Sequence, residues 1–295
     1  PLPEKPIPPY TPPVPPKIDS DGSGNLNLQG LRLRWDYGSI DPNDIIDIKV
    51  FAVEMVYVPQ GSFFLGTPGT DEPGMFFSGS KGTPYEVTSE NVINISSAAG
   101  NLYYDNTDGL GPDESIGDQL GPIPASFPKG FNAFYTMKYE VSQAQWVDYF
   151  NTLNEAQKIN NDVTGASGKN SDAEASRNAI SWLDGNTIAT TTNPDVALNY
   201  VTASMTSNYL DWAGLRHMTE LEYEKACRGP IAPKPSEFAW GNNNITTNTY
   251  AYINAGESNE LITNPEQGIG NAIYASTNGS PGGPKRVGIL SASAI

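Results

Sequence analysis

This chain has very little of the two side chains that most often carry redox and metal chemistry. Its 295 residues include one cysteine, Cys227, and one histidine, His217. A single cysteine excludes an intrachain disulfide and a cysteine-based zinc site. A single histidine excludes an iron or zinc centre unless carboxylates supply most of its ligands. We therefore interpret His217 as a structural or surface residue and Cys227 as a small residue of the core.

Positive charge is also scarce. The chain has 17 basic and 33 acidic residues, which gives a formal net charge of −16. Such a surface repels nucleic acid, so no nucleic-acid partner is predicted. The acidic excess suits a soluble or secreted protein, and acidic loops are also able to hold divalent cations. There is no run of about 18 apolar residues, so the sequence predicts no membrane span.

Proline is concentrated at the start of the chain, in PLPEKPIPPYTPPVPPK (residues 1–17). This segment is expected to be an extended polyproline II tether, either a spacer or a strap on a neighbour. The alternative is a docking ligand for a proline-binding domain. With the turn-rich stretch after it, the segment forms a first region, 1–25. A linker over 26–50, with a strand at 31–35, precedes the main domain, 51–295.

Two helices in the middle of the chain are predicted from capping and periodicity. Ser142, followed three positions later by Gln145, forms a capping box that marks a helix start. Trp146 and Phe150 then lie on one apolar face of that helix. A second helix is predicted over 203–213, where apolar residues again recur at helical spacing.

The third helix lies in the segment Arg216-His-Met-Thr-Glu-Leu-Glu-Tyr-Glu-Lys-Ala-Cys-Arg-Gly229. Thr219 is its predicted N-cap, and Glu222 completes a capping box. Gly229 is expected to end the helix, because glycine favours the residue after a helix and Pro230 prevents continuation.

The rest of the chain is predicted to consist of short strands and long loops. Strands are expected within 45–58, within 131–141 and in short pieces after residue 238. Two polar stretches, 67–125 and 154–195, are longer than the loops of a compact domain usually are, and such loops are often functional. The predicted core residues are Trp146, Phe150, Tyr209, Trp212, Tyr223 and Trp240.

The segment from Arg216 to Gly229 resembles the motif Arg-Leu-Pro-Thr-Glu-x-Glu-Trp-Glu-x-Ala-x-Arg-Gly of the formylglycine-generating enzyme (sulfatase-modifying factor) family. Four further segments resemble this family in the same order, and they are 55–66, 131–142, 199–215 and 238–254. The resemblance implies an α+β domain of the C-type-lectin-like FGE-sulfatase fold, with short strands, two or three helices and long irregular loops.

The resemblance also implies that the shared residues hold the scaffold together. Arg216 is expected to tie the third helix to neighbouring loops. Glu220, Glu222 and Arg228 are expected to be partly buried charges that need partners. The complete set of structural motif residues is Arg216, Thr219, Glu220, Glu222, Arg228, Gly229, Trp240, Gly241 and Asn242.

The catalytic residues of the family have no counterpart here. Family enzymes that oxidise a cysteine use two redox cysteines near the C-terminal end, and a related sulfoxide-synthase branch holds iron through several histidines. This chain has one residue of each kind and stops at Ile295, before the last family segments. We therefore expect the C-terminal part of the family fold to be missing, predict no catalytic residue, and lean towards a protein that is not an enzyme.

Calcium is the one cofactor that the resemblance suggests, because some family members bind it through loop oxygens. In this chain Asn254, the carbonyl of Ala255 and Glu257 would supply hard oxygen ligands. The alternative is a plain asparagine-rich turn.

Three functions remain open. We favour a non-catalytic exported protein, extracellular or on the cell surface, whose scaffold binds other protein subunits or builds a homo-oligomer or surface assembly. Export is expected because the family occurs frequently in exported bacterial proteins. The second function is a formylglycine-generating or nonhaem-iron type enzyme with catalytic residues beyond residue 295. The third is a glycan-binding module. Its ligand aromatics would be Tyr85, Tyr103, Tyr104 and Trp182, which in the alternative interpretation anchor loops.

Overall fold

The computed structural model describes residues 41, 45, 48–69, 76–79, 82–103, 121–183, 187–274 and 279–290. The proline-rich segment, the strand predicted at 31–35 and Tyr104 lie outside these residues. The chain divides into two compact units, 1–51 and 52–295. The second unit contains all the helices and strands that follow.

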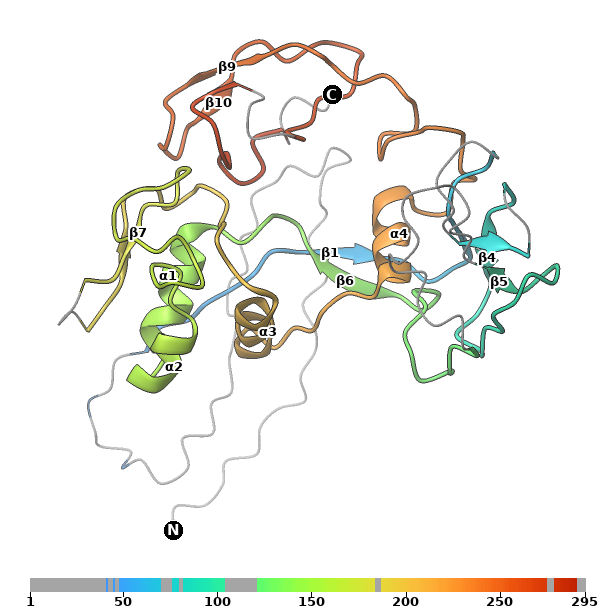
Figure 1. The fold of residues 1–295 in the computed structure, drawn as a ribbon, viewed down its shortest axis with the longest axis horizontal. Coiled ribbons are helices and arrows are strands. Elements are labelled where there is room, and N and C mark those ends of the chain that lie inside the picture. Colours follow the sequence, from blue (N-terminus) through green and yellow to red (C-terminus); the bar gives the residue numbers. More distant parts are fainter. Residues whose placement is uncertain are drawn as a thin grey trace, which may run out of the picture. The chain divides into compact units, whose positions relative to one another are not determined.

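Small sheets of two or three short strands are spread through the described part of this unit (Figure 1). The antiparallel pairs are β1 (Met55–Val58) with β6 (Phe134–Met137), β2 (Phe63–Leu65) with β4 (Tyr85–Val87), β3 (Phe77–Ser78) with β5 (Leu102–Tyr103), and β7 (Ile180–Ser181) with β8 (Thr190–Thr191). The three-stranded sheet has β9 (Tyr250–Ile253) between β10 (Leu261–Ile262) and β11 (Gly279–Ser280). Together with four helices, these strands confirm the predicted α+β class.

The helices are α1 (Gln143–Thr152), α2 (Glu155–Asn160), α3 (Ala203–Trp212) and α4 (Glu220–Arg228). Three of them, α1, α3 and α4, were predicted, and the capping boxes of α1 and α4 have the expected geometry. In α1 the hydroxyl of Ser142 accepts a hydrogen bond from Gln145 N at 3.2 Å, and Ser142 N donates to Gln145 Oε1 at 2.9 Å. This reciprocal pair satisfies two N–H groups that would otherwise lack a partner at the helix start.

Helix α2 was missed because it lies in a stretch interpreted as a polar insertion. Its own capping box joins Asn154 and Gln157, a pattern that the sequence does contain. Glu155–Asn160 has few apolar residues, and only one of its residues, Lys158, is buried. The helical spacing of apolar residues that reveals the other helices is therefore missing here. No helix in the described ranges is long and apolar enough to cross a membrane.

Two hydrophobic clusters form the core. The first is built on α1 and α3, where Trp146, Tyr149 and Tyr209 pack ring against ring with centroids 5.1–5.9 Å apart. Such aromatic pairs contribute about 0.5–1.5 kcal/mol each beyond the burial of area. The second cluster includes Phe63 from β2 and Leu221 from α4. In Figure 1 the β1–β6 ribbon lies between the helices of the first cluster and α4.

Three of the six predicted core residues, Trp146, Phe150 and Tyr209, are at most 2 % exposed and are confirmed. The fourth, Trp212, is half-buried and packs against Tyr149 and Tyr209 at the edge of the first cluster.

The predictions for Tyr223 and Trp240 are wrong, since they are 59 % and 37 % exposed. Helix α4 buries Leu221, Glu222 and Lys225, so Tyr223 lies on a different face. Trp240 stacks on Phe238 within a local turn instead of entering either cluster.

Candidate functional site

The start of α4 is held by one buried carboxylate. Glu222 accepts hydrogen bonds from Arg216 Nη1 at 2.8 Å and Nη2 at 2.6 Å, and a third from Thr219 N at 2.9 Å. Burial would raise the pKa of Glu222, but the hydrogen bonds from Arg216 and Thr219 outweigh burial and lower the pKa below its ordinary value of 4.5. Arg216 and Glu222 form a bidentate pair, the geometry in which arginine holds a carboxylate most firmly.

The remaining charges of α4 bind the strands and loops beside it. The ammonium of Lys225, 3 % exposed, donates to the carbonyl oxygens of Gly130 at 2.5 Å and Phe131 at 3.3 Å. Arg228 Nε donates to Glu237 Oε1 at 3.0 Å. Glu220 is exposed, whereas we expected a partly buried charge. The helix is therefore fastened on the side of Glu222, Lys225 and Arg228.

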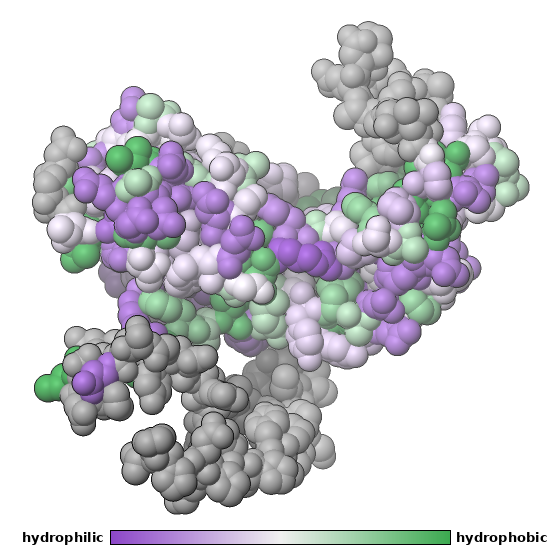
Figure 2. All heavy atoms as spheres, turned by 90° about the horizontal axis from the view of Figure 1, so that it is seen from below, coloured by the Kyte–Doolittle hydropathy of each residue, from purple (hydrophilic) through white to green (hydrophobic). Residues whose placement is uncertain are grey.

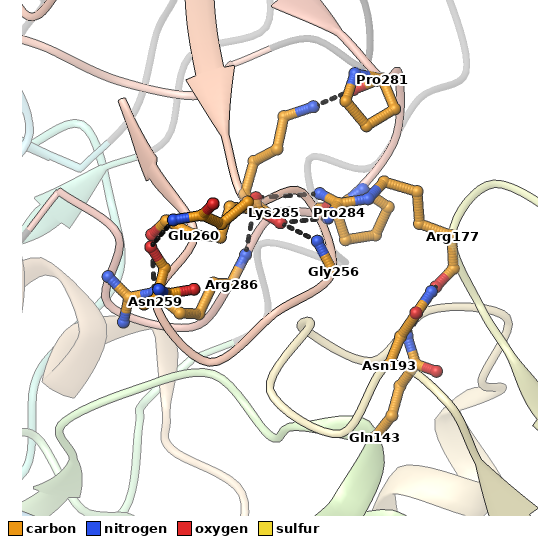
Figure 3. A network of polar contacts seen from close by, with 11 residues as sticks. Gln143, Arg177, Asn193, Gly256, Asn259, Glu260, Pro281, Pro284, Lys285 and Arg286 are labelled. Carbon is orange, nitrogen blue, oxygen red and sulfur yellow. Dashed lines mark hydrogen bonds and ion pairs between the residues drawn. The ribbon is translucent and has the colours of Figure 1, made fainter. Parts of the chain in front are cut away.

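A second buried carboxylate, Glu260, joins three segments that are far apart in the sequence (Figure 3). Arg177, 6 % exposed, donates from both terminal nitrogens to the two oxygens of Glu260, which is fully buried. Glu260 also accepts from the backbone N–H of Gly256 at 2.7 Å and of Arg286 at 3.4 Å. In return, Arg286 Nε donates to the carbonyl oxygen of Glu260 at 2.9 Å.

The backbone of Arg177 is tied to the start of α1 as well. Its carbonyl oxygen accepts from Gln143 Nε2 at 2.8 Å and from Asn193 Nδ2 at 3.1 Å. The polar insertion 154–195 is thus connected through one residue to α1 and to the C-terminal loops. The Glu260 centre, defined as Arg177, Glu260 and Arg286 with their partners, is a structural connection with its carboxylate oxygens fully used by hydrogen bonds.

Burial by itself would raise the pKa of Glu260. The hydrogen bonds from Arg177 and Gly256, together with the positive charge of Arg177, outweigh burial and lower the pKa below 4.5. The carboxylate therefore stays ionised at neutral pH, which suits an ion pair and not a general acid.

Buried lysines also hold loop segments in place through hydrogen bonds. Each of five lysines, at most 9 % exposed, donates its ammonium to backbone carbonyl oxygens of a nearby loop. They are Lys129, Lys158, Lys169, Lys225 and Lys285. Carbonyl groups in irregular backbone need partners when they are buried. These ammonium groups therefore order loops that contain no disulfide.

The residues of the calcium hypothesis lie in the turn after β9. Asn254, Ala255 and Glu257 are all exposed. Asn254 has φ 53°, and its carbonyl oxygen accepts from Glu257 N at 3.0 Å. Across the ranges that the structure describes, no three His, Cys, Asp or Glu side chains are grouped so as to hold a metal ion. Calcium binding here stays a prediction.

Three of the aromatic residues proposed as glycan ligands are described by the structure, and they lie in different places. Trp182 packs edge-on against Phe150 at 5.1 Å in the first cluster, whereas Tyr85 packs against the second cluster. Tyr103 is half-buried in β5. All three side chains are half-buried, and glycan binding through them stays a prediction.

The motif residues Trp240, Gly241 and Asn242 form a tight turn. Gly241 N donates to the carbonyl oxygen of Phe238, and Phe238 N donates to that of Asn242, both at 2.9 Å. Gly241 has φ 82°, a backbone conformation that favours glycine. Trp240 Nε1 donates to the carbonyl oxygen of Asn244 at 3.0 Å, so the indole fastens this turn.

Cys227 and His217 are both exposed. The prediction that Cys227 is a core residue is wrong, because it follows Tyr223 by four positions and lies on the same exposed face of α4. His217 Nε2 lies 2.8 Å from the hydroxyl of Ser207, which connects the lead-in of α4 to α3.

A groove lined mostly by apolar residues, with Arg216, His217 and Glu222 also in its walls, borders the β1–β6 ribbon. Its volume is about 390 Å³, and its walls include Met55, Met137, Leu210, Leu215, Met218 and Tyr135. Three of the five methionines of the chain are among them. We call these six residues the methionine groove. Methionine is flexible and polarisable, and surfaces that accept varied partners often contain several of them.

Two tyrosines continue the apolar surface along the ribbon. Tyr57 in β1 and Tyr135 in β6 lie opposite each other, with ring centroids 5.2 Å apart. They are 55 % and 64 % exposed. The next pair on the same face is Met55 with Met137, since alternate residues of a strand share a face.

The family-model comparison identifies this fold. The model of the sulfatase-modifying factor enzyme 1-like domain, FGE-sulfatase, matches residues 49–275. The chain belongs to this family. No curated protein and no solved structure gives a significant match.

Sequence reasoning missed two parts of this FGE-sulfatase domain. The Glu260 centre joins residues 83 positions apart, and no local pattern indicates that pairing. The methionine groove did leave a signal. Met55-x-Tyr57 and Tyr135-x-Met137 have strand periodicity, so an antiparallel pairing places all four side chains on one face. The sequence does not specify the register in which β1 and β6 pair.

Proposed function

We propose that this FGE-sulfatase domain is a non-catalytic structural or assembly protein, exported to the cell surface or the extracellular space, that binds other protein subunits. The observation that carries the proposal is the pair of exposed tyrosines, Tyr57 and Tyr135, beside the half-buried apolar residues of the methionine groove. Contiguous exposed apolar surface bordered by polar residues is typical of sites that bind proteins. Tyrosine is also among the residues most enriched in such interfaces.

The chemistry of the chain supports a binding role. Within these 295 residues there is one thiol, and one cysteine cannot both attack and resolve a disulfide. The charged residues of the family motif, Arg216 and Glu222, are engaged with each other in a bidentate pair. Figure 2 shows hydrophilic residues over much of one face with separate hydrophobic groups among them, a surface compatible with an extracellular protein.

Light scattering coupled to size-exclusion chromatography of the full chain tests the assembly function. We expect a mass above that of one chain, 31.7 kDa, that increases with protein concentration. A single species of one-chain mass over the whole concentration range, with no protein partner recovered from the native cells, would refute the proposal. Digestion of intact cells with an added protease tests export, because a surface protein is degraded while a cytoplasmic marker stays intact.

A further inference from the structure

We propose that the methionine groove and the Tyr57–Tyr135 pair bind the proline-rich segment, residues 1–17, of a second copy of this chain. This inference rests on the assembly function proposed above and specifies its partner. The methionine groove with the Tyr57–Tyr135 pair is the binding surface, and the proline-rich segment is its ligand. Each chain contains one of each, so copies would join head to tail through a heterologous interface.

The receiving surface has the chemistry that a polyproline helix requires. Proline-rich peptides bind in grooves lined with aromatic side chains, because the proline rings pack on flat apolar faces. Tyr57 and Tyr135 present two such rings side by side, at a tilt of 54°. Met55 and Met137 stand next to them on the same face of the ribbon. Their flexible thioethers are able to fill the irregular outline of a proline-rich chain.

The chain itself carries a matching ligand. Nine of residues 1–17 are proline, out of 25 in the whole chain. Proline fixes its own backbone dihedral angle φ, so a peptide rich in proline has little conformational entropy to lose on docking. Its charged residues are Lys5, Lys17 and Glu4, which make it net positive in a chain whose net charge is −16. Attraction between the segment and the acidic remainder of another copy therefore favours the encounter.

We favour a second copy over the same chain as the source of the bound segment, because the function proposed above is assembly. The same chain is the competing occupant, because the segment and the groove belong to one covalent chain, and such tethering gives a high effective concentration. Mixing experiments separate the two cases. Docking within one chain leaves a monomer, whereas exchange between copies produces a mass that rises with concentration.

Two full-length variants provide the test. The groove variant carries Tyr57→Ser and Tyr135→Ser, which removes exposed rings while the core clusters keep all their members. The segment variant carries Pro12→Ser, Pro13→Ser and Pro15→Ser and leaves the groove intact. Tyr274→Ser, which removes a tyrosine 60 % exposed elsewhere, is the matched control. Circular dichroism and thermal melting of all variants establish that they fold.

We expect the unmodified chain and the control to form multimers and each of the two variants alone to be monomeric. A one-to-one mixture of the groove and segment variants should form a dimer, because the intact segment of the first fits the intact groove of the second. A labelled peptide of residues 1–17 should bind the segment variant and bind the groove variant at least about tenfold more weakly, a difference of about 1.4 kcal/mol.

The outcomes separate this inference from the function on which it rests. Multimers that persist unchanged in both variants overturn the groove and its ligand while the assembly function stands. A monomeric unmodified chain with no partner refutes the assembly function. If that monomer nevertheless coexists with peptide binding to the segment variant, the segment docks within its own chain, and the second-copy inference is overturned.

Discussion

Replacement of Glu260 by glutamine should destabilise the domain strongly, although the side chain keeps its size. Glu260 is fully buried, and Arg177 beside it is 6 % exposed. Loss of the negative charge leaves the guanidinium buried without a counter-ion, and breaking such a pair costs about 3–5 kcal/mol. For a domain of this size that corresponds to a fall in Tm of roughly 6–20 °C.

Urea unfolding followed by tryptophan fluorescence measures the free energy of unfolding directly. Glu257→Gln is the matched control, since Glu257 is an exposed carboxylate of the same loop. In an Arg177→Met background, Glu260→Gln should cost clearly less, because the buried positive charge is already gone. A loss below about 1 kcal/mol for Glu260→Gln in the unmodified background would refute the structural role of this centre.

The pH dependence has a definite sign. The pKa of Glu260 is lowered in the folded protein from 4.5, so the unfolded chain binds its proton more readily. The stability that this carboxylate contributes is fully present above pH 4.5 and is lost as the pH falls through the folded-state pKa. The difference between the unmodified chain and Glu260→Gln should therefore be constant near neutral pH and shrink in acid. A difference that grows in acid would contradict the pairing.

Four further predictions concern other parts of the structure. Glu222→Gln should lower the free energy of unfolding by about 1–3 kcal/mol in urea unfolding, because Arg216 and the cap of α4 lose a charged acceptor; a neutral result would contradict it. Trp146→Ala should cost about 3–5 kcal/mol and Trp212→Ala less, since Trp146 is buried and Trp212 half-buried; the reverse order in the same assay would show that α3 is misplaced. Cys227 should react with a thiol-specific chromogenic disulfide in the native protein as completely as in urea, and a protected thiol would contradict its exposure. The calcium hypothesis predicts that added calcium raises Tm and that Glu257→Ala removes the rise, so equal melting with calcium and with chelator rejects it.

The features predicted correctly are local ones. The starts of α1 and α4 were visible because a capping box involves residues three positions apart, Ser142 with Gln145 and Thr219 with Glu222. The aromatic face of α1 was visible because helical spacing places Trp146 beside Phe150. The same reasoning failed for Tyr223, whose place within a family-like motif says nothing about which face of α4 meets the strands.

The sequence alone determined the composition-dependent properties and the helices that begin with reciprocal caps, because these depend on residue counts and on neighbours along the chain. Tertiary structure decided which charges are paired and which apolar residues stay exposed. Arg177 meets Glu260 across 83 positions, and Tyr57 meets Tyr135 only in the register of β1 with β6. Such contacts arise when distant segments pack together, and the chain between them carries no signal of where they will meet.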